Sequence, residues 1–498
     1  MIGTHRFQLS LLSIISEGRG EALGADDDGR VAEAAAVGPT VAGGKFTALS
    51  TASCAGATIE SEVSEMTTKV SADISAVHMP GDIAGRLVDP KAYGQWDQLQ
   101  QDLTWLRREM PLSVAAAEGY DPFWMVTKYN DIQEIGRQPG IFANNGARKT
   151  LIDRNFAQRA EAIEAEGGRA VNRSLLTMDA PVHMRYRLVT AAQFAPKGVK
   201  VLEEDIRGLA REAIDAMEGR DEIDFLNAVS HRFPLRVILS LLGLPRSDED
   251  MLLAMTQRFF NPRDEELAGE QTGNSIGATA NHDIFHEMYD YFAAIVANRR
   301  ANPTSDVASV IANSTINGEL ITEADAVSYY LTIATAGHDT TASSTAGAVW
   351  ALAERPEEFA KVKADRSLIP SLVNEAIRWT SPVNHFMRTA LADYELRGQQ
   401  IRAGDWLMLS YPSANRDEDI FEAPFEFRVD RQPNPQMAFG FGAHVCLGQH
   451  LAKLEMGVFF DELFNRVEHV ELAGEPKRID SISVGGIKRL PVRYKLAG

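Results

Sequence analysis

The sequence predicts a mainly α-helical fold with a small β portion. Three observations lead to this prediction. An almost uninterrupted helical pattern runs from Leu320 to Pro356, the residues FWMVT from Phe123 onward have the character of a strand, and residues 394–411 read as a small hairpin. A chain of 498 residues with 45% hydrophobic content can bury a large core.

The predicted elements follow one another along the chain. FWMVT, starting at Phe123, predicts a strand that leads into a short helix, and residues 140–176 are expected to form a long irregular connection. A helix is predicted from about Pro181, because proline suits the first turn. The long helix begins with a capping box at Thr322, and the predicted hairpin turns at two glycines.

Composition excludes several classes of function. The formal net charge of −19 at pH 7 repels nucleic acid and anionic membrane surfaces. No stretch of ~18 uncharged apolar residues occurs, so no membrane span is predicted. The 2 cysteines, Cys54 and Cys446, exclude a disulfide framework and a cysteine cluster for zinc or iron–sulfur binding. This cysteine usage predicts a reducing, cytoplasmic location.

Residues 1–80 differ in composition from the rest of the chain. They are rich in Ala, Gly, Ser, Thr and acidic residues and have almost no aromatic side chains. We predict a low-complexity N-terminal extension that is disordered or lies upstream of the true start, for which Met66 and Met79 are alternatives. A denser, more regular pattern predicts a domain over residues 81–498.

The middle of the long helix, AGHDTT at residues 336–341, places polar groups inside an apolar element. Such groups are costly without partners or a function. In one interpretation, Thr340 and Thr341 hydrogen-bond to carbonyls four residues earlier and Asp339 caps a neighbouring element. In the other, Gly337 lets a flat ligand approach the backbone, while Asp339 and Thr340 relay protons into a dry pocket. This motif alone leaves both interpretations open.

A second motif is EAIR, with Glu375 and Arg378 on a helix that ends by Pro382. Their i, i+3 spacing places both side chains on one face, where they can pair. Most pairs of this kind are solvated surface contacts.

The third motif is FGFGAHVCLG, residues 439–448, which runs directly into a helical pattern. Its glycines allow backbone N–H groups to turn toward the sulfur of Cys446. The positive end of the following helix is expected to favour the ionised thiolate, a metal ligand. A buried structural thiol is the alternative interpretation.

Together these motifs resemble the cytochrome P450 superfamily. FGFGAHVCLG is similar to its haem-binding signature, AGHDT to its oxygen-activation motif and EAIR to the structural pair behind the haem. The motifs occur in the family's order, and the resemblance covers about residues 80 to 498. It implies one haem-thiolate domain of the soluble bacterial type, similar to the branch that hydroxylates terpene alcohols such as terpineol and linalool.

The resemblance also implies roles for individual residues. Asp339 and Thr340 would be catalytic, Glu375 and Arg378 would form the structural pair, and Cys446 would bind the haem iron. The residues implied to contact the haem are Cys446, His183, Arg187, Arg388, His444, Phe439, Ala336, Gly337 and Gly448. The residues implied to line the substrate pocket are Ile333, Ala336, Thr341, Val383 and Phe386. The third partner of the structural pair is not assigned, although Glu426, Arg428 and Arg431 are nearby in the sequence.

The implied function is a monooxygenase with haem b that inserts one atom of O2 into a small or medium apolar, terpenoid-like substrate. Electrons would come from NAD(P)H indirectly, through a separate ferredoxin and its reductase, and the protein would act as a monomer. Steroid, alkylaromatic and fatty acyl substrates remain alternatives. A haem-thiolate peroxygenase or isomerase would share Cys446 but have little need for Asp339 and Thr340. A non-catalytic haem sensor would be expected to carry an output domain.

Overall fold

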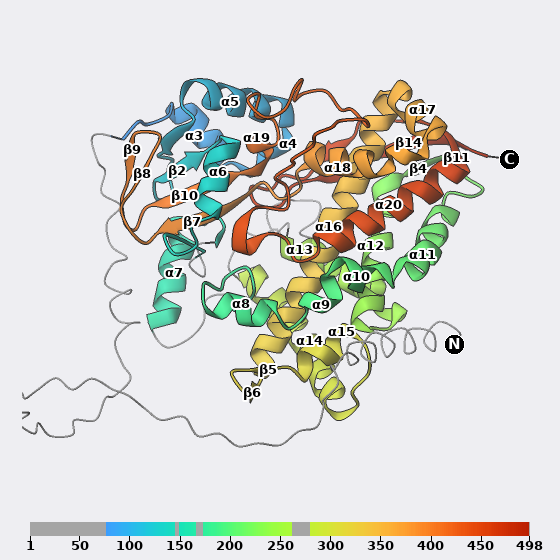
Figure 1. Ribbon diagram of the computed structural model, residues 1–498, viewed down its shortest axis with the longest axis horizontal. Helices are drawn as coiled ribbons and strands as arrows, with labels where there is room; N and C mark the ends of the chain where they lie inside the picture. Colours follow the sequence, from blue (N-terminus) through green and yellow to red (C-terminus); the bar gives the residue numbers. More distant parts are fainter. Residues whose placement is uncertain (1–75, 145–148, 166–172, 261–278, 498) are drawn as a thin grey trace, which may run out of the picture. The chain divides into compact units, whose positions relative to one another are not determined.

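Long helices and a few short strands make up the part of the chain that the computed structural model describes, residues 76–144, 149–165, 173–260 and 279–497 (Figure 1). The helices are, in chain order, α3 (Gly81–Leu87), α4 (Pro90–Gly94), α5 (Trp96–Glu109), α6 (Tyr129–Gly136), α7 (Arg154–Ala165), α8 (Val182–Arg187), α9 (Ala191–Phe194), α10 (Pro196–Lys200), α11 (Glu203–Asp215), α12 (Arg232–Leu242), α13 (Glu249–Phe260), α14 (Thr279–Ala301), α15 (Val307–Ala312), α16 (Glu323–Glu354), α17 (Pro356–Ala364), α18 (Ile369–Thr380), α19 (Tyr411–Ala414) and α20 (Gln449–Arg466). The predicted mainly α fold with a small β portion is confirmed.

The strands form one larger sheet and several small ones. They are β1 (Leu112–Ala115), β2 (Phe123–Val126), β3 (Phe142–Ala143), β4 (Glu222–Asp224), β5 (Thr315–Ile316), β6 (Glu319–Leu320), β7 (His385–Ala390), β8 (Tyr394–Leu396), β9 (Gln399–Ile401), β10 (Trp406–Ser410), β11 (Val467–Leu472), β12 (Lys477–Arg478), β13 (Ile487–Arg489) and β14 (Pro491–Leu496). The five-stranded sheet has the order β1-β2-β10-β7-β3, in which β10 runs parallel to β2 and antiparallel to β7. A three-stranded sheet has the order β11-β14-β4.

Helix α16 organises the helical part of the fold (Figure 1). Its 32 residues correspond to a length of roughly 48 Å at the usual rise per residue. Thr322 caps the helix by accepting a hydrogen bond from the backbone N–H of Asp325 at 3.1 Å, as the capping box predicts. The helix packs against α12, α14 and α18, and side chains on all its faces are buried. Burial along most of its length explains why its sequence is largely apolar or made of small residues.

Several local predictions are confirmed by the structure. FWMV forms β2, which leads into α6, and α8 begins directly after Pro181. The predicted hairpin is formed by β8 and β9 alone, whereas β10 pairs with β2 and β7 in the five-stranded sheet. The predicted turn residues Gly398 and Gly404 have φ angles of 70° and 93°. The expectation for residues 140–176 is wrong in part, because Arg154–Ala165 in this range forms helix α7.

The described residues lie in a compact unit that spans Val70–Gly498. Most of the predicted extension, residues 1–75, lies outside the described residues. Its last residues belong to the fold, because the N–H of Met79 donates to the carbonyl of Val114 at 3.1 Å and the Met79 side chain is buried. None of the helices in the described ranges is both long and apolar enough to cross a membrane.

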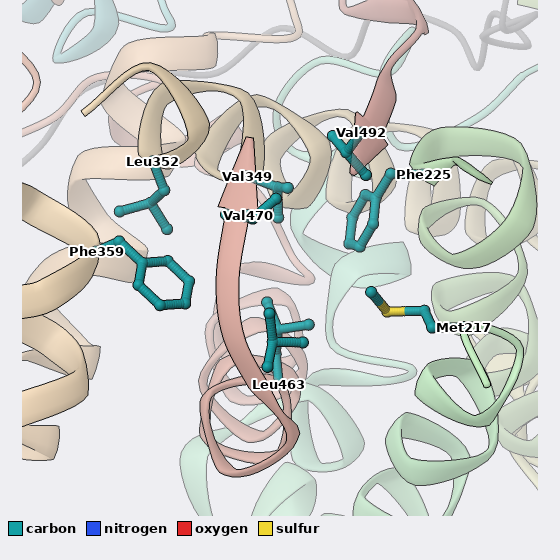
Figure 2. A pocket seen from close by; sticks show the side chains of 9 residues that line it. Met217, Phe225, Val349, Leu352, Phe359, Leu463, Val470 and Val492 are labelled. Atoms are coloured by element: carbon teal, nitrogen blue, oxygen red, sulfur yellow. The ribbon is translucent and has the colours of Figure 1, made fainter. Parts of the chain in front are cut away.

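An apolar pocket lies beside the C-terminal half of α16, among α17, α20 and the strands β11 and β14. Figure 2 shows its lining, which includes Phe225, Val349, Phe359 and Leu463. Hydrophobic side chains form the whole lining, and none of the predicted site residues belongs to it. A pocket of this composition lacks groups for acid–base or metal chemistry, so we assign it to the core.

His385 in β7 predicts an acid-sensitive contribution to stability. The ring is buried, its Nδ1 donates to the carbonyl of Ile482 at 3.0 Å, and its Nε2 accepts from the N–H of Leu151 at 3.0 Å. Burial of this neutral ring lowers the pKa of His385 to about 4. Between pH ~6.5 and ~4 the unfolded chain therefore binds a proton that the folded chain does not, and stability falls as the pH falls through this window, by at most about 1.4 kcal/mol per pH unit.

Urea unfolding between pH 7 and 4.5 checks this prediction by comparing the wild type with His385→Gln. The variant is expected to lose part of the pH dependence and not all of it, because burial also lowers the pKa of His231 to about 4. Identical slopes for the two proteins would contradict the prediction.

Candidate active site

The loop before α20 holds Cys446 in a defined backbone conformation. The N–H of Cys446 donates to the carbonyl of Phe439 at 2.9 Å, which closes the loop. Gly442 has a φ of 81°, and a Cβ at this position would lie 1.9 Å from the carbonyl oxygen of Gly136 in α6. Only glycine fits both requirements. The loop is therefore fixed against α6 as well as against the start of α20.

Two backbone N–H groups act on the Cys446 sulfur, but burial opposes its ionisation. Burial raises the pKa of the Cys446 thiol, and the backbone N–H groups of Gly448 and Gln449, with the more distant charge of Arg187, only partly oppose that rise. The start of α20 thus acts in the predicted direction, but burial outweighs its effect on the pKa of the Cys446 thiol. A metal cation in contact with the sulfur would supply the missing stabilisation. A Cβ at Gly448 would meet no atom within 4 Å, so this side of the loop is open.

Basic side chains from three separate segments converge near this loop. The rings of His183 in α8 and His444 lie with their centroids 3.9 Å apart, and Arg187 and Arg388 both act electrostatically on His444. Burial and these three basic neighbours lower the pKa of His444 to about 3. Asn144, which the sequence did not single out, places its Nδ2 at 3.0 Å from His444 Nδ1. The structure therefore brings together all four predicted basic residues.

The centre of α16 presents an open face inside an otherwise buried helix. Ala336 is exposed and Thr340 is partly exposed, whereas most residues of α16 are buried. Thr340 Oγ1 donates to the carbonyl of Ala336 at 3.0 Å, and Thr341 Oγ1 donates to that of Gly337 at 3.3 Å. Both hydroxyls thus make the backbone bonds of the first interpretation. The Thr340 oxygen keeps lone pairs that can accept a hydrogen bond from a ligand on the open side.

In the structure, Gly337 provides space for a neighbouring helix, whereas the sequence suggested space for a flat ligand. A Cβ on Gly337 would lie 2.6 Å from Cδ1 of Ile238, so this glycine permits close packing of α16 on α12. Asp339 does not cap a neighbouring element. Its Oδ1 pairs with Nε2 of His338 at 3.0 Å, and its Oδ2 is buried without a hydrogen-bond partner in the described part of the chain. The role of His338 was not predicted; of its partners, Thr256 lies on another helix, α13, 82 residues earlier in the chain.

Glu375 and Arg378 form a buried network and not a surface pair. Neither residue is exposed, and Arg378 donates to both carboxylate oxygens of Glu375 at 2.7 Å. Arg431 is the unassigned third partner, because its Nε lies 3.1 and 3.0 Å from the two oxygens. Glu426 contributes only its main-chain carbonyl, which accepts from both arginines. The two arginines hold the pKa of Glu375 below its usual value, although burial alone would raise it.

The predicted substrate-pocket residues do not all face the same environment. Ile333 and Thr341 on α16 are buried, whereas Ala336 is exposed and Val383 and Phe386 are half-buried. Phe386 packs edge-to-face on Tyr411, with ring centroids 6.2 Å apart. Ala336, Val383 and Phe386 therefore offer accessible apolar surface, and the other two contribute mainly to packing.

The residues present fit an iron porphyrin with two propionates. Four basic side chains crowd together with few carboxylates to balance them, and Nε2 of His183 is buried without a hydrogen-bond partner among the described residues. Carboxylates of a ligand would satisfy both conditions. The single sulfur of Cys446 lies in the neighbouring loop, and a cysteine sulfur is a known axial ligand of haem iron. This donor set on a mainly helical fold is typical of a haem-thiolate enzyme.

Comparisons with known proteins agree with this class. The family model for cytochrome P450 matches residues 278–497. Cytochrome P450-terp of a Pseudomonas species is 44% identical over 423 residues, which cover 84% of this chain and 99% of that protein. A steroid C26-monooxygenase of Mycolicibacterium smegmatis is 32% identical over 76% of this chain and 84% of its own length.

Solved structures extend the same result. The crystal structure of CYP108D1 from Novosphingobium aromaticivorans has a TM-score of 0.78 and 44% identity, and the match covers 84% of this chain and 100% of that one. Cytochrome P450 CYP268A2 of Mycobacterium marinum, in complex with pseudoionone, has a TM-score of 0.72 and 29% identity over 80% and 95% of the two chains. The chain belongs to the cytochrome P450 family and is a monooxygenase that uses haem iron and O2.

Proposed function

We propose that this protein binds haem b through the Cys446 sulfur and hydroxylates a small or medium apolar, terpenoid-like substrate. The observation that carries the proposal is the position of Cys446 in a glycine-constrained loop beside four converging basic side chains. When bound, the haem supplies the activation of dioxygen, which a thiolate ligand favours. Binding of the propionates, shielding of the sulfur and proton transfer are proposed for residues of the protein itself.

The basic residues His183, Arg187, Arg388 and His444 are proposed to bind the two propionates. Their convergence and the unpartnered Nε2 of His183 support this role. Phe439 is proposed to shield the sulfur from one side, and Ala336 to leave room on the α16 side. Gly448 is proposed to contact the haem on the open side of the loop, where a Cβ would meet no atom within 4 Å.

Asp339 and Thr340 are proposed to deliver protons to the open face of α16, where Thr340 can also hydrogen-bond a ligand. In the structure the two side chains have separate partners, Asp339 with His338 and Thr340 with the carbonyl of Ala336. Thr340 can then accept a hydrogen bond on the open face of α16, while the Asp339 carboxylate one residue away can take up a proton and pass it on. An acid and an alcohol in this order limit the entry of water.

We propose that electrons originate from NAD(P)H and reach the protein through a ferredoxin reductase and a ferredoxin. The exposed Arg185 and Leu188, in and next to α8, support docking of an acidic partner on this side. His183 is buried and cannot add to such a surface. Because all proposed site residues come from one chain, we propose a monomer, and the low cysteine content supports a cytoplasmic location.

The proposed substrate class depends on the accessible apolar surface of Ala336, Val383 and Phe386. The names of two relatives, cytochrome P450-terp and the complex with pseudoionone, favour a terpenoid. Other relatives are named a steroid C26-monooxygenase and a methyl-branched lipid omega-hydroxylase, so steroids and lipids are the second candidates.

Thr340→Ala tests the proposed chemistry. With ferredoxin, reductase and a terpene alcohol, the wild type is expected to form hydroxylated product. The variant is expected to bind substrate normally but to form roughly tenfold less product per electron, with peroxide in its place, because a positioned proton-transfer group contributes about 10²–10⁴-fold and water replaces it in part. Product and peroxide are both measured against NADH consumed.

Thr340→Ser is the matched control, because it keeps the hydroxyl group. Unchanged coupling in Thr340→Ala would contradict the role of Thr340. A spin-state change on addition of steroids or fatty acids, with none for terpene alcohols, would overturn the proposed substrate class and leave the monooxygenase assignment intact.

A further inference from the structure

A buried polar cluster surrounds the carboxylate of Asp339 on the side of α16 that faces α12 and α13. His338 has no exposed surface, and Thr256 of α13 is equally buried. His338 Nε2 lies 3.0 Å from Asp339 Oδ1 and 3.1 Å from Thr256 Oγ1. The cluster therefore joins the middle of α16 to α13, at the same height as the proposed acid–alcohol pair.

The hydrogen-bond partners of His338 determine how many protons its ring carries. Nδ1 lies 2.9 Å from the carbonyl oxygen of Ala334, which can only accept. Thr256 Oγ1 donates to the carbonyl of Leu253 at 3.0 Å, so it offers a lone pair to His338 Nε2. The carboxylate of Asp339 is also an acceptor. When Asp339 is ionised and the Thr256 hydroxyl donates to Leu253, both ring nitrogens face acceptors, and a ring that is protonated on both satisfies all of these contacts.

The charges around the pair agree with this count. Burial alone would lower the pKa of His338, but the Asp339 carboxylate holds it above its usual value. In return, His338 holds the pKa of Asp339 below its usual value, against the effect of burial. Both directions favour the form of the pair in which an imidazolium and a carboxylate share one transferable proton.

A second histidine near Asp339, His231, has a contact that requires one of its ring nitrogens to be without a proton. His231, at the start of α12, has its Nδ1 3.2 Å from the amide nitrogen of Gln257, which donates, so Nδ1 carries no proton. Burial lowers the pKa of His231 to about 4, while Asp224 and Arg232 act on it with opposite signs. Of the histidines beside Asp339, His338 is thus the one with a proton to give.

We propose that His338 is the proton donor to Asp339, resting on the proposed monooxygenase function. The proton on His338 Nε2 moves to Asp339 Oδ1, which leaves a neutral imidazole that keeps its Nδ1 proton and a neutral carboxylic acid. The acid then gives one proton toward the open face of α16 and returns to the carboxylate. One proton from solvent restores the imidazolium, on the α13 side where Gln257 is partly exposed. The pair carries no net charge before or after the first step, one negative charge after the acid has given its proton away, and no net charge again once a proton from solvent has been taken up.

A purely structural histidine is the competing explanation, and His338→Gln separates the two. The glutamine amide can donate to Asp339 and Thr256, so it maintains the packing, but it holds no proton that it can transfer. If His338 relays protons, the variant keeps its melting temperature and haem content but loses roughly tenfold in product per electron, within the range for loss of a positioned acid. Product per electron equal to that of the wild type overturns the relay.

A second measurement does not depend on turnover. Long-range ¹H–¹⁵N spectra of the histidine rings in the reduced, carbon monoxide-bound holoprotein, which is diamagnetic, report the protons on each nitrogen. We expect His338 to carry protons on both nitrogens at pH 7 and to lose one in Asp339→Asn. His385 is the internal reference, because its contacts require a neutral ring with one bare nitrogen. A bare Nε2 in His338 of the wild type at pH 6 overturns the proposal.

Ser328→Ala is the matched control on α16, because it removes a different buried polar group, a hydroxyl about three turns from His338. It is expected to behave as the wild type in both measurements. Failure of the wild type to form any product with its redox partners would overturn the proposed function and the relay with it, whereas normal turnover with unchanged coupling in His338→Gln overturns the relay alone.

Discussion

Replacing Cys446 with serine is expected to abolish both product formation and the spectral signature of a thiolate ligand. A serine hydroxyl stays protonated near neutral pH and donates far less electron density to iron than a thiolate. The backbone of the loop should be unaffected, because the bond from residue 446 to the carbonyl of Phe439 is made by the main-chain N–H. The basic residues around His444 remain in place, so the variant is expected to retain some haem.

The measurement is the position of the Soret band in the reduced carbon monoxide complex, together with haem content and product yield. Cys54→Ser is the control, since it removes the other thiol of the chain and should leave the spectrum unchanged. A thiolate-type spectrum in Cys446→Ser, or purified wild-type protein without porphyrin, would refute the assignment of Cys446.

Replacing Glu375 with alanine is expected to have the largest effect on folding. The carboxylate accepts from Arg378, Arg431, the N–H of Arg428 and Asn434, all in a buried site. Its removal leaves two buried guanidinium groups without their counter-charge, which costs about 3–5 kcal/mol. We therefore expect a lower free energy of unfolding by this amount and poor incorporation of haem.

Glu426→Gln is a well-matched control for Glu375→Ala. Glu426 lies beside the same two arginines but contributes only its main-chain carbonyl, and its side chain is exposed. Urea unfolding and the ratio of haem to protein are compared for the two variants. Equal stability of both would mean that the buried network does not hold this part of the fold together.

Predictions from the sequence were accurate where the signal is local. The cap at Thr322, the proline before α8 and the glycines of the hairpin act through neighbouring residues, so their effect is visible in the sequence. Contacts between distant segments were not predictable in the same way. Arg431 is 56 residues from Glu375, and Thr256 is 82 residues from His338. Nothing in the local sequence selects Arg431 over Arg428.

In the candidate site, too, local features were predictable and effects of the surrounding fold were not. The motif around Cys446 identified the loop and the basic residues that converge on it. It did not indicate that burial would raise the pKa of the Cys446 thiol, because desolvation depends on the whole surrounding fold. The explanation for Gly337 changed for a related reason, since Ile238 comes from a helix almost 100 residues earlier, a difference that only the folded chain reveals.

The close approach of α16 to α12 also bears on how the enzyme could be redesigned. A side chain at position 337 must occupy space that Cδ1 of Ile238 now fills, 2.6 Å from where its first carbon would be. The two positions therefore behave as one unit under mutation, and a larger residue at one calls for a smaller residue at the other. Saturation libraries that vary position 337 alone would therefore contain mainly strained proteins. Libraries that vary both positions together would include compatible pairs that single substitutions rarely reach.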